Sequence, residues 1–279
     1  MPVMGSTVVR RQLGRQLRHL RDAAHKTERD VEEAGLASRA KLWRIESGKT
    51  AIKIADVRAL CWLYGADEAT TDALAALATG TSARGWWEDY GDVLPKWFSL
   101  YVGLESAASE IRIYEPELIH GLLQTPAYLR AIYEAVYEAN GEPIDEEAIQ
   151  LQTKLRQERQ QALTTRIPPL RLTAVFSAGV LARRVGSKAL MREQISRLRE
   201  LNRLDHVDIR VMPWDVGSHA AMHIGGFAIL DFPEEDDPAI VYLESHTFAR
   251  YLEEPKELAE YRRIYESVYR KAIPIEEFR

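Results

Sequence analysis

A ten-residue segment near the N-terminus places basic and hydroxyl side chains on one side of a predicted helix. In residues 37–46, ASRAKLWRIE, Leu42 and Ile45 are three positions apart and would face inward. The outward side chains would then be those of Ser38, Arg39, Lys41 and Arg44. Arginine can donate two hydrogen bonds to a guanine edge, whereas lysine and serine more often bind phosphates. The pattern favours a helix that reads the major groove of double-stranded DNA, the alternative being a solvated basic helix face.

The preceding segment combines a helical apolar stripe with further basic residues. The stripe consists of Val9, Leu13, Leu17, Leu20 and Ala24. The arginines between these positions are predicted to lie off the stripe and to stay solvated: Arg10, Arg11, Arg15, Arg18 and Arg21. We expect Arg10, Arg11 and Arg15 to lie near DNA phosphates.

Aromatic and polar residues later in the chain could bind a small molecule. The residues that we expect to line such a pocket are Trp86, Trp87, Trp97, Tyr101, His219 and Tyr242. For the aromatic residues of 86–101, the alternative is a hydrophobic core or a contact between domains.

Three residues form a candidate catalytic group. Glu244 and His246 would share one strand face and could transfer a proton, with His223 as a further member. His219 and His223 are four apart, but their stretch is bounded by glycines and has no HExxH pattern, so we predict no metal site. No phosphate-binding glycine loop, serine nucleophile elbow or cysteine–histidine motif is found. We therefore expect no cofactor, and the sequence favours a protein that is not an enzyme.

Short helices are predicted to position the basic residues. Thr27 can cap a helix that runs to about Ala34, Gly35 breaks the chain, and Ser38 can cap a helix over residues 39–46. Helices over 54–64, closed by Gly65, and around 74–78 complete a five-helix, all-α domain over residues 1–79. The small, polar residues 80–85 are the predicted linker.

Residues 86–279 are predicted to form a larger mixed α/β domain, so the overall fold class is α+β. Helical patterns occur at about 95–110, 126–139, 145–163, 188–203 and 255–271. Strand patterns occur at 170–176, 207–212, 227–232 and 240–243, and residues 234–238 would form a turn between the last two.

The charge of the chain differs between these two parts. The formal net charge is -5, but residues 1–60 contain 13 Lys or Arg and 7 Asp or Glu, which gives +6 there and −11 in the remainder. A basic domain joined to an acidic one is typical of a nucleic-acid module attached to a second function. Cys61 is the only cysteine, which excludes an internal disulfide and a multi-cysteine zinc site. The chain has no apolar run of membrane-spanning length and no secretory-signal pattern, so we expect a cytoplasmic protein without membrane contact.

Two families share these motifs. Residues 6–78 resemble the Xre/Cro-type helix-turn-helix domain of bacterial regulators, with Ser38-Arg39, Lys41 and residues 44–48, RIESG, as the match. Residues 85–275 resemble DUF5753, which follows that domain in many actinobacterial regulators. The matching strings are GWWEDY at 85–90, EPEL at 115–118, GLLQT at 121–125 and YLE at 242–244. The resemblance implies a transcriptional regulator, often acting beside a small antitoxin-like partner protein.

Three residues depart from the helix-turn-helix pattern. Glu28, Glu32 and Leu36 occupy positions where the family has Gln, a small residue and Gly. A carboxylate near DNA repels phosphates, and a long charged side chain at position 32 must either shift the helices or pair with a nearby base such as Arg39.

Two hypotheses follow from these patterns. The first is a regulator that binds an inverted DNA repeat as a homodimer, with a second domain that senses a small molecule or a partner protein. The second is an enzyme or small-molecule-binding protein on a regulator scaffold that has lost DNA binding, with its pocket in the second domain. A protein-interaction module acting through the acidic domain is a third alternative.

Overall fold

The fold is α+β, as the sequence predicts. The computed structural model describes residues 5–46, 50, 52–78, 96–233, 238–246 and 248–278. The chain divides into two compact units, residues 1–103 (unit 1) and 104–279 (unit 2). Within the described parts, none of the helices has the length and hydropathy needed to span a bilayer.

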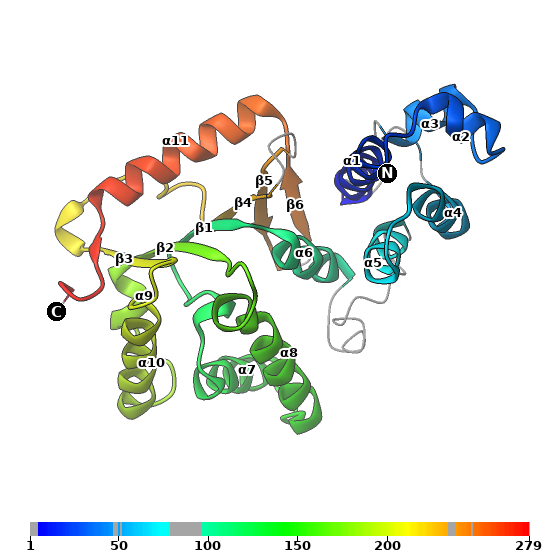
Figure 1. Ribbon diagram of the computed structural model, residues 1–279. Coiled ribbons are helices and arrows are strands. Elements are labelled where there is room, and N and C mark those ends of the chain that lie inside the picture. The colour runs from blue at the N-terminus through cyan, green and yellow to red at the C-terminus, as the bar shows by residue number, and fades with distance from the viewer. Residues whose placement is uncertain are drawn as a thin grey trace. The chain divides into compact units, whose positions relative to one another are not determined.

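Unit 1 contains the five predicted helices (Figure 1). Their bounds are α1 (Gly5–Ala23), α2 (Glu28–Glu33), α3 (Arg39–Glu46), α4 (Ile54–Tyr64) and α5 (Glu68–Ala78). A further helix, α6 (Lys96–Ala107), crosses the division between the units.

Local hydrogen bonds explain where the short helices begin and end. Thr27 and Asp30 form a reciprocal capping box at the start of α2, and the Ser38 hydroxyl accepts from the backbone N–H of Lys41 in the first turn of α3. Gly35 and Gly65 both have φ of 73°, a conformation that costs glycine little and other residues more. The predicted caps and breaks of this unit are therefore confirmed.

The core of unit 1 joins the inward faces of these helices. Its buried residues include Leu13 and Leu17 of α1, Leu42 and Ile45 of α3, and Val57 of α4. Leu20, Ala24 and Leu36 pack against this cluster while partly exposed. The predicted stripe of α1 is thus buried from Leu13 onward.

Unit 2 is built around a seven-stranded sheet with the order β6-β5-β4-β1-β2-β3-β7. The strands are β1 (Glu110–Glu115), β2 (Arg171–Ser177), β3 (Val207–Met212), β4 (Phe227–Asp231), β5 (Ile240–Glu244), β6 (Ala249–Leu252) and β7 (Ile273–Pro274). Strands β1, β2 and β3 are parallel, and the remaining neighbours pair antiparallel.

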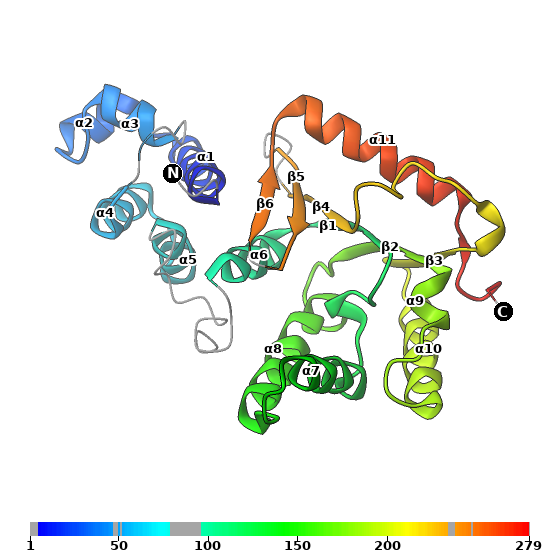
Figure 2. The ribbon, with the colours of Figure 1, turned by 180° about the vertical axis from the view of Figure 1, so that it is seen from behind.

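Helices cover both faces of this sheet. The helices are α7 (Pro126–Asn140), α8 (Glu146–Thr164), α9 (Ala178–Ala182), α10 (Lys188–Leu201) and α11 (Pro255–Lys271), with 3-10 turns η2 (Gly121–Leu123) and η3 (Trp214–Val216). Figures 1 and 2 show α11 on one face and α7, α8 and α10 on the other. Helices α7 and α8 connect β1 to β2, and α9 and α10 connect β2 to β3, as the crossover between parallel strands requires.

The predicted strands and helices of unit 2 are present, but three strands were not predicted. Strand β1 lies between β2 and β4 in the middle of the sheet, where Ile111 and Ile113 are buried. Its charged residue Arg112 alternates with them and pairs with Glu110 and Asp231 at 2.9 and 3.0 Å. The alternation of apolar and charged residues was the available signal, but it is short and follows directly on a helix.

Several predictions fall on residues outside the described parts. These are the linker at 80–85, Trp86, Trp87, Tyr90, residues 47–48 of the helix-turn-helix match and the acidic turn at 234–237. The side chains of Val9, Arg11 and Trp97 also lie outside the described set.

Candidate nucleic-acid interface

Helix α3 presents its basic face to solvent. Leu42 and Ile45 are buried in the core of unit 1, as their spacing predicts. The outward side chains are those of Ser38, Arg39 and Arg44, which are exposed, and Lys41, which is partly exposed. The structure therefore leaves the side chains of these four predicted residues at the surface of α3 and its N-terminal end.

A buried ion pair fixes α3 against α1. Arg21 donates from Nε to Glu46 Oε1 at 2.7 Å and from a terminal nitrogen to Glu46 Oε2 at 2.9 Å. The two residues are only 8% and 9% exposed, so the prediction that Arg21 stays solvated is wrong. The bond to Glu46 raises the pKa of Arg21, although burial acts in the opposite direction. Because Arg21 also donates to the Lys26 carbonyl oxygen, it links α1, α3 and the turn before α2.

Helix α1 approaches α3 closely at Gly14. A Cβ atom at this position would lie 2.4 Å from the Ile45 carbonyl oxygen and 2.6 Å from that of Glu46. Only glycine permits this separation without movement of one helix. Gly14 thus permits the short distance between α1 and α3.

Two basic residues of α3 have carboxylate partners within unit 1. Arg39 Nε donates to Glu32 Oε2 at 3.0 Å, and Lys41 Nζ donates to Asp56 Oδ2 at 3.0 Å. The predicted pairing of Glu32 with Arg39 is confirmed, and it places the Glu32 side chain at the surface. Because such exposed pairs contribute about 0–1 kcal/mol, a phosphate or base can replace either carboxylate at small cost.

Arg44 Nε donates to the Ala40 carbonyl oxygen of its own helix at 3.2 Å. Arg10 and Arg15 of α1 are partly buried. The aromatic side chain next to Arg44, Trp43, is 51% exposed. The surface of α3 therefore combines cations with one large ring.

Helix α2 is acidic, but most of its carboxylates have partners. Asp30 belongs to the capping box, and the bonds from the Thr27 backbone and side chain hold the pKa of Asp30 below its ordinary value. Glu33 accepts from Arg29 Nε at 2.6 Å. Glu28 has no hydrogen bond or ion pair among the described residues.

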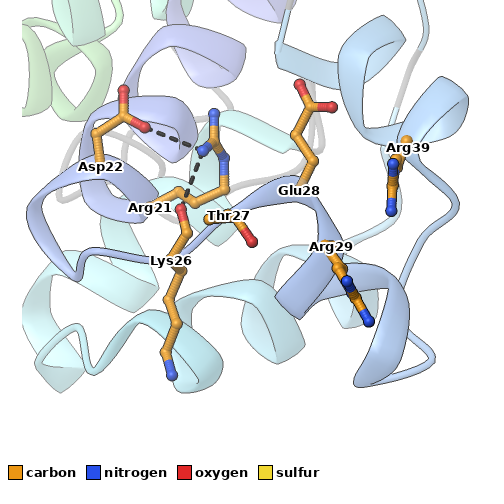
Figure 3. Close-up of a pocket in the computed structure, with 7 residues that line it drawn as sticks. All are labelled: Arg21, Asp22, Lys26, Thr27, Glu28, Arg29 and Arg39. Atoms are coloured by element: carbon orange, nitrogen blue, oxygen red, sulfur yellow. Dashed lines mark hydrogen bonds and ion pairs between the residues drawn. The ribbon is translucent and has the colours of Figure 1, made fainter.

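An open hollow of about 710 Å³ lies beside the start of α3. It is lined by Arg21, Asp22, Lys26, Thr27, Glu28, Arg29 and Arg39. Figure 3 shows Arg29 and Arg39 on one side and Arg21 with Asp22 and Lys26 on the other, with Glu28 between them. Three of its four cations, Arg21, Arg29 and Arg39, pair with carboxylates outside the lining, which belong to Glu46, Glu33 and Glu32. A phosphate at this hollow would therefore have to replace those carboxylates as partner.

The structure brings together only some of the candidate ligand-binding and catalytic residues that were predicted in residues 86–279. The Tyr242 hydroxyl donates to Glu244 Oε2 at 3.0 Å, and the Tyr242 ring packs against Tyr251 with 5.3 Å between centroids. Strand β5 ends at Glu244, so His246 lies in the following turn, exposed, rather than on the strand face. Glu244 thus contacts Tyr242, and the expected strand-face pair with His246 is not formed.

The other candidates of this group lie elsewhere. His219 is partly buried with its ring edge-on to Tyr114 at 5.8 Å, whereas His223 is exposed. Burial, reinforced by Lys271, lowers the pKa of His219. Tyr101 is fully buried and stacks on Phe98 at 5.5 Å. The described residues contain no group of three or more His, Cys, Asp or Glu side chains placed to hold a metal ion.

Comparison with known families agrees with this division of the chain. A family model described as a domain of unknown function, DUF5753, matches residues 98–279, which is more than half of the chain. The chain belongs to the DUF5753 family. In this DUF5753 protein a second model, described as a helix-turn-helix domain, matches residues 12–74. No curated protein and no solved structure matches the chain.

The match over residues 12–74 begins within α1, covers α2, α3 and α4 and ends within α5. The helix-turn-helix is therefore α2 and α3, with Gly35 in the turn. This domain indicates a DNA-binding regulator, in which the second helix of the motif enters the major groove.

Proposed function

We propose that this DUF5753 protein is a cytoplasmic regulator of the Xre type that binds an inverted DNA repeat as a homodimer. Unit 2 would sense a small molecule or an antitoxin-like partner protein and thereby alter DNA binding. The observation that carries the proposal is the outward face of α3, with Ser38, Arg39, Lys41 and Arg44 on a helix-turn-helix domain.

In this proposal α3 reads bases, with Arg44 and Arg39 as the side chains that can bond guanine edges. Lys41 and Ser38 would hold phosphates, and Arg10, Arg11 and Arg15 of α1 would add charge near the backbone. Binding would exchange Glu32 and Asp56 for DNA groups as partners of Arg39 and Lys41. Glu32 of α2 and Asp56 of α4 thus make binding conditional on this exchange.

In this proposal the protein binds its operator as a dimer. A single α3 contacts only one half-site, and two copies related by a two-fold axis would contact half-sites about 34–36 Å apart. The operator would then be a palindrome whose half-sites are separated by one turn of DNA.

The test begins with selection of bound sequences from a random duplex library at about 50 mM salt, where counterion release favours binding most. Fluorescence anisotropy then measures the affinity for a selected duplex and for a scrambled one. We expect Arg44→Gln to weaken binding to the selected duplex about 10- to 100-fold, as loss of a bidentate base contact does. Lys41→Gln should weaken binding to both duplexes alike and reduce the salt slope by about 1.

Arg203→Gln is the matched control, because it removes the same charge from an exposed site in unit 2. It should leave both affinities unchanged. Absence of any DNA retardation at low salt, or equal weakening by Arg203→Gln and Arg44→Gln, would overturn the proposal.

A further inference from the structure

Arg156 of α8 has a guanidinium that no carboxylate of the described residues contacts as an ion pair. Its Nε is buried and has no hydrogen-bond partner, and Arg156 forms no ion pair with any described residue. Burial, together with the nearby Arg159, lowers the pKa of Arg156 to about 10. Proteins rarely keep a buried cation unpaired, because the charged form then loses its hydration without replacement.

Glu105 and the Gly121 carbonyl oxygen, which lie near Arg156, already have other partners. Glu105 is held by Arg159, one turn further along α8, through two bonds of 2.7 Å between fully buried side chains. The Gly121 carbonyl oxygen accepts from Gln160 Nε2 at 3.1 Å, and the Gln124 carbonyl oxygen accepts from the same nitrogen at 2.8 Å. Helix α8 therefore carries one paired and one unpaired arginine.

The backbone beneath Arg156 is shaped to admit the guanidinium. A Cβ atom at Gly121 would lie 2.3 Å from a terminal nitrogen of Arg156. A larger residue at 121 would push the side chain away, so glycine permits this close approach. The position of Arg156 against η2 is consequently a packed one.

Acidic groups lie at the same edge of the sheet. Glu115 ends β1, Gly226 precedes β4 and Glu244 ends β5, and the antiparallel pairing of these neighbouring strands puts the three positions side by side. Burial and the charge of Glu244 raise the pKa of Glu115 to about 8. The charges of Glu244 and Arg156 also influence each other's pKa, as do those of Tyr133 and Arg156.

This arrangement lies where open α/β sheets bind ligands, beyond the carboxyl end of a parallel strand. Arg156, Tyr133 and Glu115 are each partly exposed, and Glu244 is exposed. The cluster thus combines a guanidinium whose Nε has no partner with two carboxyl groups.

We propose that Arg156 binds the compact oxyanion, a carboxylate or a phosphate, of a small-molecule ligand whose remaining polar groups face Glu115 and Glu244. The guanidinium supplies the donors in a fork that matches such an anion. A role for this site in sensing rests on the proposed function of unit 2, whereas the binding itself does not.

The test measures thermal stability and heat of binding with sodium phosphate and with sodium succinate, at up to about 50 mM and with ionic strength matched by sodium chloride. We expect saturable stabilisation of the full chain by at least one of the two. Succinate alone would assign a carboxylate, and phosphate alone would assign a phosphate. No stabilisation beyond the sodium chloride control by either anion would overturn the proposal.

Two variants separate binding from folding. Arg156→Gln should raise the dissociation constant at least tenfold while the protein without ligand stays as stable as before or becomes more stable. Arg171→Gln, at an exposed arginine at the start of β2, should bind like the unchanged protein. Equal binding by Arg156→Gln and the unchanged protein would overturn the proposal. Duplex DNA should bind equally to the unchanged protein, Arg156→Gln and Arg171→Gln. If none of the three bound DNA, the proposed function would be refuted, but the conclusion on anion binding would stand.

Discussion

The Arg21–Glu46 pair offers the sharpest test of how α3 is held. Replacement of Arg21 by Met removes two bonds of 2.7 and 2.9 Å and leaves Glu46 as a buried carboxylate without its partner. Breaking such a pair costs about 3–5 kcal/mol of unfolding free energy, whereas replacing both partners by apolar residues is often close to neutral. Domains have only about 5–15 kcal/mol in total, so the single change should bring unit 1 close to unfolding.

The assay is a double-mutant cycle. We expect Arg21→Met to lower the unfolding free energy by about 3–5 kcal/mol. Glu46→Met should lower it somewhat less, because Arg21 then still contacts Asp22 at 3.0 Å and the Lys26 carbonyl oxygen. The double variant should recover to within about 1–2 kcal/mol of the unchanged protein. Hydrogen exchange, read by mass spectrometry on peptides from residues 13–46, measures the unfolding free energy of unit 1 separately from that of unit 2.

The exposed pair Arg29–Glu33 is the matched control, since the same two replacements there should cost no more than about 1 kcal/mol. A double Arg21→Met/Glu46→Met variant that loses the sum of the two single losses would refute the reasoning. It would mean that the pair stabilises through packing of its two side chains and not through their charges.

Three further predictions concern helix spacing, DNA repulsion and pH. Gly14→Ala should destabilise unit 1 by about 1–3 kcal/mol in urea unfolding, because its Cβ meets the backbone of α3 and the better helix propensity of alanine offsets only about 1 kcal/mol. Glu28→Gln should tighten DNA binding about 3- to 10-fold in anisotropy, because it removes a carboxylate that repels phosphates from the hollow beside α3. The folded protein keeps the Glu115 proton between about pH 4.5 and 8, whereas the unfolded chain releases it, so the unfolding free energy should fall as the pH rises through this range. Glu115→Gln should reduce this fall, as measured by the melting temperature at each pH.

Each of these has a result that would contradict it. An unchanged unfolding free energy in Gly14→Ala, with His19→Ala on the exposed face of α1 as control, would show that α1 shifts at no cost. If Glu28→Gln bound DNA with the same affinity as the exposed control Glu193→Gln, the Glu28 carboxylate would not repel the DNA. A parallel pH dependence of the unchanged protein and Glu115→Gln would show that this carboxyl does not carry the effect.

Much of the helix-turn-helix and its candidate interface could be predicted from sequence. Thr27, Gly35, Ser38 and Gly65 act on backbone groups within a few residues, so their effects are visible locally. The outward face of α3 follows from the three-residue spacing of its apolar side chains. The pairing of Glu32 with Arg39 was also foreseeable, because a charged side chain at that position needs a nearby partner.

The ligand candidates were predicted less well, since burial and partners depend on distant parts of the chain. Tyr101 lies in a core and His246 lies beyond the end of its strand. The sequence does not predict that Glu244 lies near both Glu115 and Arg156. This proximity arises because β1 lies between β2 and β4 and because Arg156 of α8 packs against η2.

By itself, the sequence determined the five helices of unit 1 with caps or breaks at Thr27, Gly35, Ser38 and Gly65, most helices and four strands of unit 2, and a basic domain joined to an acidic one. Those features depend on hydrogen bonds and apolar spacing within three or four residues. Only the tertiary structure decided that Arg21 is buried, because its partner Glu46 is 25 residues away, and that Arg156 is left unpaired, because Glu105 binds Arg159 instead. The charge of a side chain can be read from its type, but its partner is set by packing.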